Sequence, residues 1–465
     1  MTAAGRVPGS RDGRRRGIPL SFMVSPGVFA RRKFTDDGPS MLKSYGPMVL
    51  PDTPPPPVSA AETEAALKAA LVASEKYGRF NHRRLEALES LAEFLVRRER
   101  WLEAEPLKLQ ILSAKEKLYG PEHQSLAPTM AELAVGYEAM GRFDQAEAVL
   151  TLALKINERD AMQNTAAIAG NLAGLGRLEA IRGRWSEAET HLVRALKITR
   201  IVHGPDHTEM ARLLTRWGEA ALEGGQTMAA AAKLEEADRI YTHALGAAHP
   251  DTANVWVQRG QWARRMGRWA EAESFYRRAM AVHEHREGGW GISVGAVLLS
   301  LGVLENARGR PRRAEAHLDR ARAIRENILG ADSPAVAESL GPWAEAVAEL
   351  GRFETAEEAY LRAWGTFEKC FGPESPALLR TINNLAELYF RRSADEEAER
   401  LLRQAVTLAE KTHGPESPAS TRALQNLLVA FEAQDRWDEA EAVRAKLTPT
   451  RARGRAAGHE RTTRT

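Results

Sequence analysis

The side chains best suited to recognise another molecule are carboxamides and arginines towards the C-terminal end of the chain. A carboxamide carries N–H donors and a carbonyl acceptor, so neighbouring Asn and Gln side chains can pair with a peptide backbone whatever its sequence. Arginine adds a planar fork that can hold a carboxylate through two hydrogen bonds. The group consists of Asn383, Asn384, Gln425, Asn426, Arg380, Arg391 and Arg422. A second polar cluster consists of Asn254, Gln258, Gln261 and Arg264. Both clusters favour noncovalent recognition, with plain solvated surface as the alternative interpretation.

The sequence offers no constellation that predicts catalysis. It contains neither a phosphate-binding Gly-x-x-x-x-Gly-Lys-Ser/Thr motif nor a Gly-x-Gly-x-x-Gly motif at a strand end. His203 and His207 are four residues apart, but a Gly-Pro pair interrupts any helix between them. His283 and His285 are two residues apart, so on a helix they point in different directions. We therefore expect no metal, no cofactor and no enzymatic activity.

The composition is that of a folded globular protein, with 43% hydrophobic and 27% charged residues among 465. No run of eighteen apolar residues exists, which predicts no membrane span. Cys370 is the only cysteine, so a disulfide framework and a cysteine-rich zinc site are excluded. Arg outnumbers Lys by 52 to 13, which indicates a GC-rich, bacterial gene. We expect a cytoplasmic location, because residues 18–30 make a poor signal-peptide core.

Basic segments flank an acidic body. Residues 1–50 carry nine Lys and Arg against three Asp and Glu, and residues 450–465 carry five Arg against one Glu. The whole chain has a net charge of +3, so the body between them carries about −7. These segments predict a disordered basic, proline-rich leader over residues 1–57 and a disordered arginine-rich tail over residues 448–465. The tail lacks interleaved aromatic residues, so nucleic-acid binding is not expected.

A repeat of 42 residues organises the body. The segment GRFDQAE at residues 141–147 returns as GRWSEAE at residues 183–189. One column of the repeat is alanine in all nine registers: Ala104, Ala146, Ala188, Ala230, Ala272, Ala314, Ala356, Ala398 and Ala440. A second column is also small: Ala92, Ala134, Gly176, Gly218, Gly260, Gly302, Ala344 and Ala386. Small residues at two fixed positions predict two helices per repeat whose backbones approach closely.

The helix boundaries follow from the same period. In the eighth repeat, Leu378, Ile382, Leu385 and Tyr389 keep the spacing of one helical face over residues 378–391, and a second helix begins near Asp395. Glycine recurs where a repeat ends, and Ser-Pro pairs at 333–334, 375–376 and 417–418 predict an N-cap followed by a first helical turn. Residues 78–447 therefore predict nine repeats, and residues 58–77 predict an N-terminal capping helix.

This pattern resembles the tetratricopeptide repeat in its 42-residue form, as in kinesin light chains and their bacterial relatives. The matching segments are LGADSP at residues 329–334, FGPESP at 371–376, INNLA at 382–386 and GRFETAE at 351–357. The resemblance implies an all-α, right-handed superhelical solenoid of about nine two-helix repeats with an N-terminal capping helix. Residues 1–77 lack the heptad pattern of a kinesin light chain coiled coil, so a motor-bound role is not implied.

The resemblance also implies a mode of action. In this family the first helix of each repeat lines a concave groove that binds extended peptides, which places the carboxamides and arginines above in such a groove, like the asparagine-lined groove of kinesin light chains. We therefore expect a non-enzymatic scaffold or adaptor that binds an extended peptide or a partner's helix. The alternatives are a self-associating assembly unit, with repeats four and six contacting at Thr227 and Pro311, and a regulatory subunit of a separate enzyme.

Three other columns predict structural roles. Cys370 shares its position with mostly apolar residues, so it is expected to be a small core residue. The column that begins with Glu105 and Glu147 is glutamate in eight of nine repeats, which favours a structural or solvated role over paired catalytic carboxylates. The aromatic residue of the Gly-Arg-aromatic turn, such as Phe143 or Trp269, is expected to wedge between helices.

Overall fold

The computed structural model describes residues 60–78, 80–160 and 163–447, and every regular element in these ranges is helical. The leader and the tail expected at residues 1–57 and 448–465 lie outside the described residues. The chain begins with α1 (Ala60–Ala73) and a short 3-10 turn (Glu75–Tyr77), followed by nine helix pairs. The single capping helix expected over residues 58–77 thus ends early, because the Ser74 hydroxyl donates to the Leu71 carbonyl (2.5 Å) and competes with the helical pattern.

Each repeat consists of a first helix, a turn and a second helix, and a link joins it to the next repeat. The first helices are α2 (His82–Arg97), α4 (Leu126–Ala139), α6 (Thr165–Ile181), α8 (Thr208–Glu223), α10 (Pro250–Arg265), α12 (Ile292–Ala307), α14 (Pro334–Glu349), α16 (Ala377–Arg391) and α18 (Pro418–Ala433). The second helices are α3 (Trp101–Tyr119), α5 (Phe143–Glu158), α7 (Trp185–His203), α9 (Thr227–Leu245), α11 (Trp269–Glu287), α13 (Pro311–Leu329), α15 (Phe353–Phe371), α17 (Asp395–His413) and α19 (Trp437–Leu447).

The two small columns hold the helices of each repeat together, as the sequence predicts. All nine alanines of the first column are fully buried. In the second column, a Cβ atom added at Gly260 would lie 2.4 Å from the ring of Tyr276, and one added at Gly302 would lie 2.4 Å from Cγ of Leu318. Glycine is therefore required there by the approach of the opposite helix rather than by its own backbone angles.

The aromatic wedge is confirmed in some turns and wrong in others. Trp101 and Phe143 are buried, with 6% and 4% of their surface exposed. Trp269 and Trp437 keep 36% and 59% exposed, so they do not wedge between helices. Trp437 opens the last helix of the described chain, where no further repeat packs against it.

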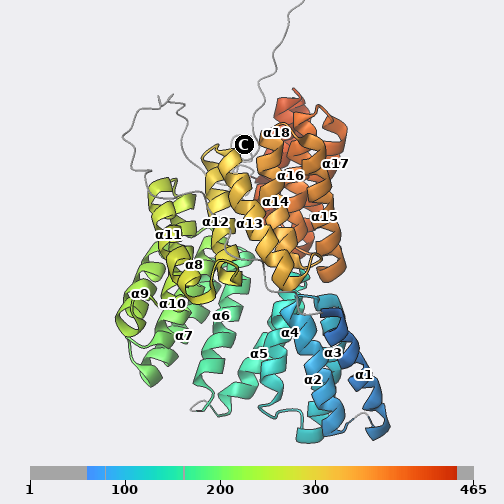
Figure 1. Cartoon of the computed structure of the whole chain (residues 1–465), viewed down its shortest axis with the longest axis vertical. Coiled ribbons are helices and arrows are strands. Elements are labelled where there is room, and N and C mark those ends of the chain that lie inside the picture. The colour runs from blue at the N-terminus through green and yellow to red at the C-terminus, as the bar shows by residue number, and fades with distance from the viewer. Residues whose placement is uncertain (1–59, 79, 161–162, 448–465) are drawn as a thin grey trace, which may run out of the picture.

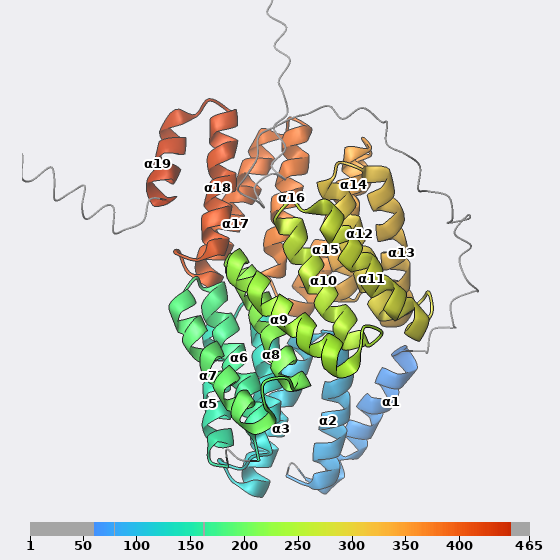
Figure 2. The same ribbon diagram turned by 90° about the vertical axis from the view of Figure 1, so that its left-hand side faces the viewer.

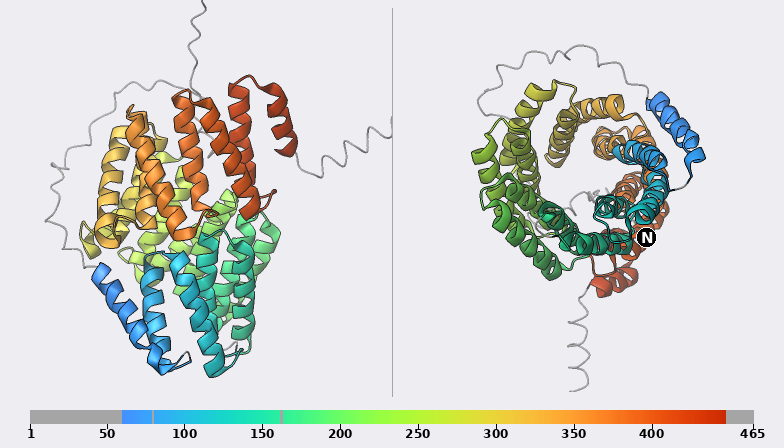
Figure 3. Two further views of the ribbon diagram at one scale, coloured as in Figure 1. Left: turned by 90° about the vertical axis from the view of Figure 1, so that its right-hand side faces the viewer. Right: turned by 90° about the horizontal axis from the view of Figure 1, so that it is seen from below.

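The nine pairs wind into a right-handed superhelix (Figures 1 and 2). Neighbouring repeats are joined by contacts between their first helices, such as α6 with α8 and α12 with α14, and by contacts of each second helix with the next first helix. The first helices therefore form the inner layer around the superhelix axis and the second helices form the outer layer, as the axial view in Figure 3 shows. We call the surface of the first helices that faces the axis the inner wall.

The superhelix completes one full turn and begins a second. Repeats seven to nine of the second turn therefore lie against repeats one to three of the first (Figures 1 and 3). Arg98 donates to the carbonyl of Leu329 at 2.9 Å, and the Ser375 hydroxyl donates to the carbonyl of Ala139 at 2.7 Å. These bonds join residues 231 and 236 positions apart, so one superhelical turn takes about five and a half repeats of 42 residues. We call this contact between the turns of repeats one to three and the links before repeats seven to nine the seam.

Candidate functional site

Both polar clusters predicted from the sequence belong to first helices of the inner layer. On α16 the positions that face the axis are Arg380, Asn384, Glu387 and Arg391, spaced by four, three and four residues. The equivalent positions of α10 are Asn254, Gln258, Gln261 and Arg265. Arg380 and Asn254 are exposed, while Gln258 and Gln261 are half-buried, so solvent reaches this surface.

The carboxamides of repeats eight and nine meet across two helices. Nδ2 of Asn426 on α18 donates to Oδ1 of Asn383 on α16 at 3.0 Å. Oδ1 of Asn426 is buried and has no hydrogen-bond partner among the described residues. Both side chains are half-buried, whereas Gln425 beside them is exposed. The pair is therefore held in place by one hydrogen bond and keeps further donor and acceptor capacity.

Asn384 has a different environment from Asn383. Its side chain lies close to the Tyr360 hydroxyl of α15. Burial, together with the negative charges of Glu345 and Glu387, holds the pKa of Tyr360 well above its usual value. Asn384 thus contacts the second helix of the preceding repeat, and it is half-buried rather than fully available to a ligand.

The three predicted arginines differ in whether their guanidinium groups already bind other residues of the protein. Arg391 donates to Oε1 of Glu349 at 2.8 Å and to the carbonyl of Ala348 at 3.2 Å, and its guanidinium lies 5.3 Å from the centre of the Phe353 ring. Its fork is therefore engaged by α14, which lessens its capacity for a ligand carboxylate. Arg380 and Arg422 are exposed.

Repeat five faces repeats seven to nine across the superhelix. The pKa of Arg265 is lowered by burial and then by the positive charges of Arg264 and Arg422, so α10 and α18 lie within electrostatic reach of each other. The pKa of Glu345 on α14 is raised by burial, while Arg264 and Arg380 act in the opposite direction. The two clusters that are separate in the sequence thus belong to one surface.

The structure adds a polar ladder that the sequence analysis missed. Arg177 of α6 lies between two carboxylates, with Nη1 at 2.5 Å from Glu138 of α4 and Nε at 2.8 Å from Glu223 of α8. Asn306 of α12 donates to the Pro342 carbonyl at 2.8 Å and to Glu345 at 3.2 Å. These contacts tie successive first helices along the inner wall. The sequence does carry a signal for this ladder: polar residues recur one, four and five positions after the second small column.

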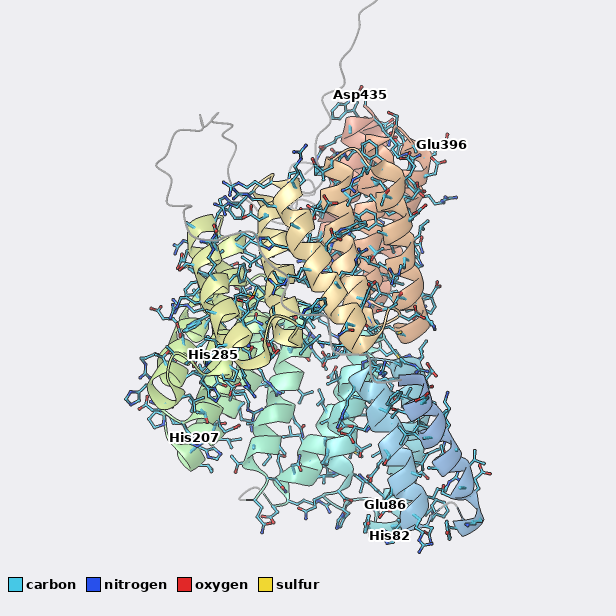
Figure 4. The ribbon with its side chains drawn as sticks, viewed as in Figure 1. His82, Glu86, His207, His285, Glu396 and Asp435 are labelled. Atoms are coloured by element: carbon cyan, nitrogen blue, oxygen red, sulfur yellow. The ribbon has the colours of Figure 1, made fainter. Side chains whose placement is uncertain are left out.

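Glu138 makes the stability of this ladder depend on pH. Burial raises its pKa to about 7, with Glu223 adding to the increase and Arg177 opposing it. The folded state therefore holds this proton more tightly than the unfolded chain, and the stabilisation is lost as pH rises from about 4.5 through 7. We expect the wild type to lose up to about 3 kcal/mol of local unfolding free energy relative to Glu138→Gln between pH 5 and 8, measured by hydrogen exchange of α4, α6 and α8. Glu86→Gln, at an exposed site (Figure 4), is the matched control, and equal pH profiles for all three proteins would contradict the assignment.

A small pocket lies where α6, α7 and α8 meet. It is partly open to solvent and has room for about one water molecule. It is lined by Ala169, Gly170, Thr199, Glu209, Arg212, Leu213 and Arg216. Arg212 forms an ion pair with Glu209 inside this set, so one of the two arginine charges of the pocket is balanced.

The histidines and the cysteine have structural surroundings. His207 and His249 are N-caps of α8 and α10, accepting from the backbone N–H groups two residues on at 3.1 and 3.2 Å. His283 is buried and His285 is exposed; Figure 4 shows His207 and His285 on the outside of the molecule. Among the described residues, no group of three or more His, Cys, Asp and Glu could hold a metal ion. Cys370 is buried, as expected, and burial raises its pKa to about 11.

The glutamate column has a structural role, as predicted, and the structure shows its mechanism. Each of six glutamates forms an ion pair with an arginine in or beside the turn of the following repeat. The pairs are Glu105–Arg142, Glu147–Arg182, Glu273–Arg308, Glu315–Arg352, Glu357–Arg392 and Glu399–Arg436. They are partly exposed, so each contributes roughly 0–1 kcal/mol and serves mainly to set the register between repeats.

Among the described residues, every helix is too short or too polar to span a lipid bilayer.

One solved structure shares this architecture, and two others are similar over shorter stretches of the chain. The solved structure of a Rap protein complexed with competence and sporulation factor has a TM-score of 0.52 and 16% identity, covering 83% of this chain and 97% of its own. BtubC (BKLC) from P. vanneervenii has a TM-score of 0.42 and 19% identity, covering 48% and 90%. A candidate kinesin light chain from Podosopora anserina has a TM-score of 0.36 and 22% identity, covering 47% and 99%. At 16% identity, the likeness to the Rap protein shows the fold alone, and nothing further is concluded from the other two structures.

The sequence itself carries the family signature. No curated protein sequence matches the chain. The family profile described as tetratricopeptide repeat matches residues 83–159, 165–242, 209–285, 293–363, 340–411 and 378–443. These matches cover most of the nine helix pairs. The chain belongs to the tetratricopeptide repeat family.

Proposed function

We propose that this protein is a non-enzymatic interaction scaffold that binds an extended peptide segment of a partner on its inner wall, mainly at α16 and α18. The supporting observation is the pair formed by Asn383 and Asn426, which join two neighbouring first helices at 3.0 Å and leave a buried carboxamide oxygen without a partner. An unsatisfied buried acceptor costs about 1–3 kcal/mol. If the Asn426 side chain rotates so that its Oδ1 accepts from a backbone N–H of the ligand, this cost is removed.

The arginines add a preference rather than the main affinity. Arg380 and Arg422 are exposed at equivalent positions of α16 and α18, where they can hold an acidic side chain or a terminal carboxylate of the ligand. Arg391 is a weaker candidate because Glu349 already occupies it. Asn254, Gln258 and Gln261 extend the same surface across the axis, so a longer peptide would reach them. The preformed wall limits the ordering cost to the peptide, which favours micromolar affinity for a single segment.

The test uses a displayed library of short random peptides selected on the full chain. We expect enriched peptides to bind with micromolar Kd and to lose at least about tenfold in affinity to Asn383→Ala/Asn426→Ala, because the two paired hydrogen-bonding groups are removed. Gln404→Ala changes an exposed carboxamide on the outer helix α17 and is the matched control. Equal binding to all three proteins, with unchanged circular dichroism, would reject the inner wall of repeats eight and nine as the site.

The Rap protein above was solved in complex with competence and sporulation factor, which supports a fold of this kind as a ligand-binding scaffold. A cytoplasmic location, the absence of nucleic-acid binding and the absence of catalysis remain predictions. Service as a regulatory subunit of a separate enzyme is compatible with the same inner-wall site.

Self-association is the second candidate function. It is favoured by large apolar side chains on the second helices, since Ile201 of α7 is 84% exposed and Met228 of α9 in repeat four is 75% exposed. Sedimentation over a range of concentrations separates the two functions. A mass that stays that of one chain would remove self-association, and a dimer lost in Ile201→Ser/Met228→Ser would establish it.

A further inference from the structure

The three links that form the seam differ in sequence from the other links. At the capping position they hold Ser333, Ser375 and Ser417, each followed by proline, and these serines are 6%, 0% and 1% exposed. The equivalent residues outside the seam are Asn81, His123, Thr165, His207, His249 and Gly291, of which only His249 is followed by proline. A distinct link sequence therefore occurs only where two turns of the superhelix meet.

The turns on the other side of the seam are matched to these links. A Cβ atom added at Gly141 would lie 2.5 Å from the Glu374 carbonyl oxygen, and one added at Gly183 would lie 3.2 Å from Cδ of Pro418. Gly351 has the same kind of backbone, with φ +83° against +75° at Gly141, yet nothing lies within 4 Å of its added Cβ. The turn glycines of the seam are thus required by close approach as well as by positive φ.

Fewer contacts cross the seam than join neighbouring repeats to each other. Besides the bonds from Arg98 and Ser375, the Phe143 ring meets the His413 ring edge-on at a centroid distance of 4.9 Å. Each hydrogen bond of this kind replaces hydrogen bonds to water, so its net contribution to stability is small. Neighbouring repeats, in contrast, share continuous buried cores of leucine and alanine. Opening of the seam therefore requires much less free energy than unfolding of a repeat.

We propose that the seam is a latch that controls sideways access to the inner wall. This inference rests on the proposed function, because it concerns how a partner reaches that surface. With the seam closed, repeats one to three cover the side of repeats seven to nine, and a ligand enters along the axis, as a short peptide or a chain with a free end. With the seam open, an internal segment of a folded partner also reaches the inner wall.

Cysteine accessibility in the full chain tests the latch without a peptide ligand. Cys370, the sole cysteine, is replaced by alanine, and a new cysteine is placed on the inner wall by Arg380→Cys or on the outer layer by Glu396→Cys (Figure 4). The probes are N-ethylmaleimide and a short-linker maleimide carried on streptavidin. Gly141→Asn widens the seam, and Gly351→Asn imposes the same backbone strain away from it.

We expect Gly141→Asn to raise the rate at which the streptavidin-borne maleimide labels residue 380 by at least about tenfold, with no change at residue 396 or for N-ethylmaleimide. In Gly351→Asn, we expect the same probe to label residue 380 at the rate measured in the parent protein. Equal labelling of residue 380 by the bulky probe in the two variants would overturn the latch. Because no peptide is used, this result can fail while peptide binding to the inner wall stands, and the reverse also holds.

A distance measurement guards against an unfolded variant. Spin labels at Glu103 of α3 and Lys369 of α15, both exposed beside the seam, report its width by double electron–electron resonance. We expect a longer and broader distance distribution in Gly141→Asn than in Gly351→Asn, with the helical circular dichroism of both unchanged. A distribution that is the same in both variants would also overturn the proposal.

Discussion

Replacement of Asp238 by alanine is expected to lower the free energy of local unfolding of repeats four and five by about 2–4 kcal/mol. Asp238 of α9 is 9% exposed and serves several donors of its surroundings. Its Oδ1 accepts from Nε1 of Trp256 at 2.8 Å and from the Thr242 hydroxyl at 3.1 Å, and its Oδ2 accepts from Arg259. Removal of the carboxylate leaves a buried indole N–H and a partly buried guanidinium without their acceptor.

Hydrogen exchange of α9 and α10 measures this loss directly, because a solenoid opens locally and a single unfolding free energy is not defined for the whole chain. Asp206→Ala is the control, since it removes an exposed carboxylate that pairs with Arg239 at 3.0 Å, and it should change exchange by less than about 0.5 kcal/mol. Asp238→Asn keeps an acceptor for Trp256 and should fall between the two. A variant Asp238→Ala as stable as Asp206→Ala would show that the network contributes nothing.

Gly302→Ala is expected to destabilise repeat six by about 1–3 kcal/mol. The added methyl group would lie 2.4 Å from Cγ and 2.6 Å from Cδ2 of Leu318, which is itself fully buried on α13. The two helices must separate, or Leu318 must leave its rotamer, because the core offers no space for the extra carbon.

Gly365→Ala provides a control of opposite sign. Gly365 lies at an exposed position within α15, and a Cβ atom there meets nothing within 4 Å, so alanine should stabilise the helix by up to about 1 kcal/mol. Urea midpoints followed by circular dichroism and hydrogen exchange of α12 and α13 compare the variants. Destabilisation of the same size at both positions would mean that helix approach is not what selects glycine in this column.

The candidate site was predictable in its chemistry and only partly in its geometry. Asn383 and Asn426 were identified from columns of the repeat, and the structure joins them across adjacent helices. Arg391 was assigned the same capacity as Arg380, but its position on α16 brings it to Glu349 on α14. Whether a charged side chain is free depends on its neighbour one repeat away, and a column taken by itself does not contain this information.

The seam shows the same limit at longer range. The Ser-Pro pairs of the last three links were interpreted as helix starts, and Ser333 and Ser417 do cap α14 and α18. Their restriction to three links had a second cause, because those links meet the turns of repeats one to three. The contact joins residues more than 230 positions apart, so nothing local distinguished it from capping.

The sequence by itself determined the nine helix pairs, their boundaries and the small columns that pack them, because helix periodicity, caps and glycine stops act within one repeat of 42 residues. Only the tertiary structure decided that the superhelix closes on itself, that repeat five faces repeats seven to nine, and which arginines are already paired. The reason is cumulative geometry. A small rotation at each repeat interface adds up over about five and a half repeats, and that sum determines which residues meet.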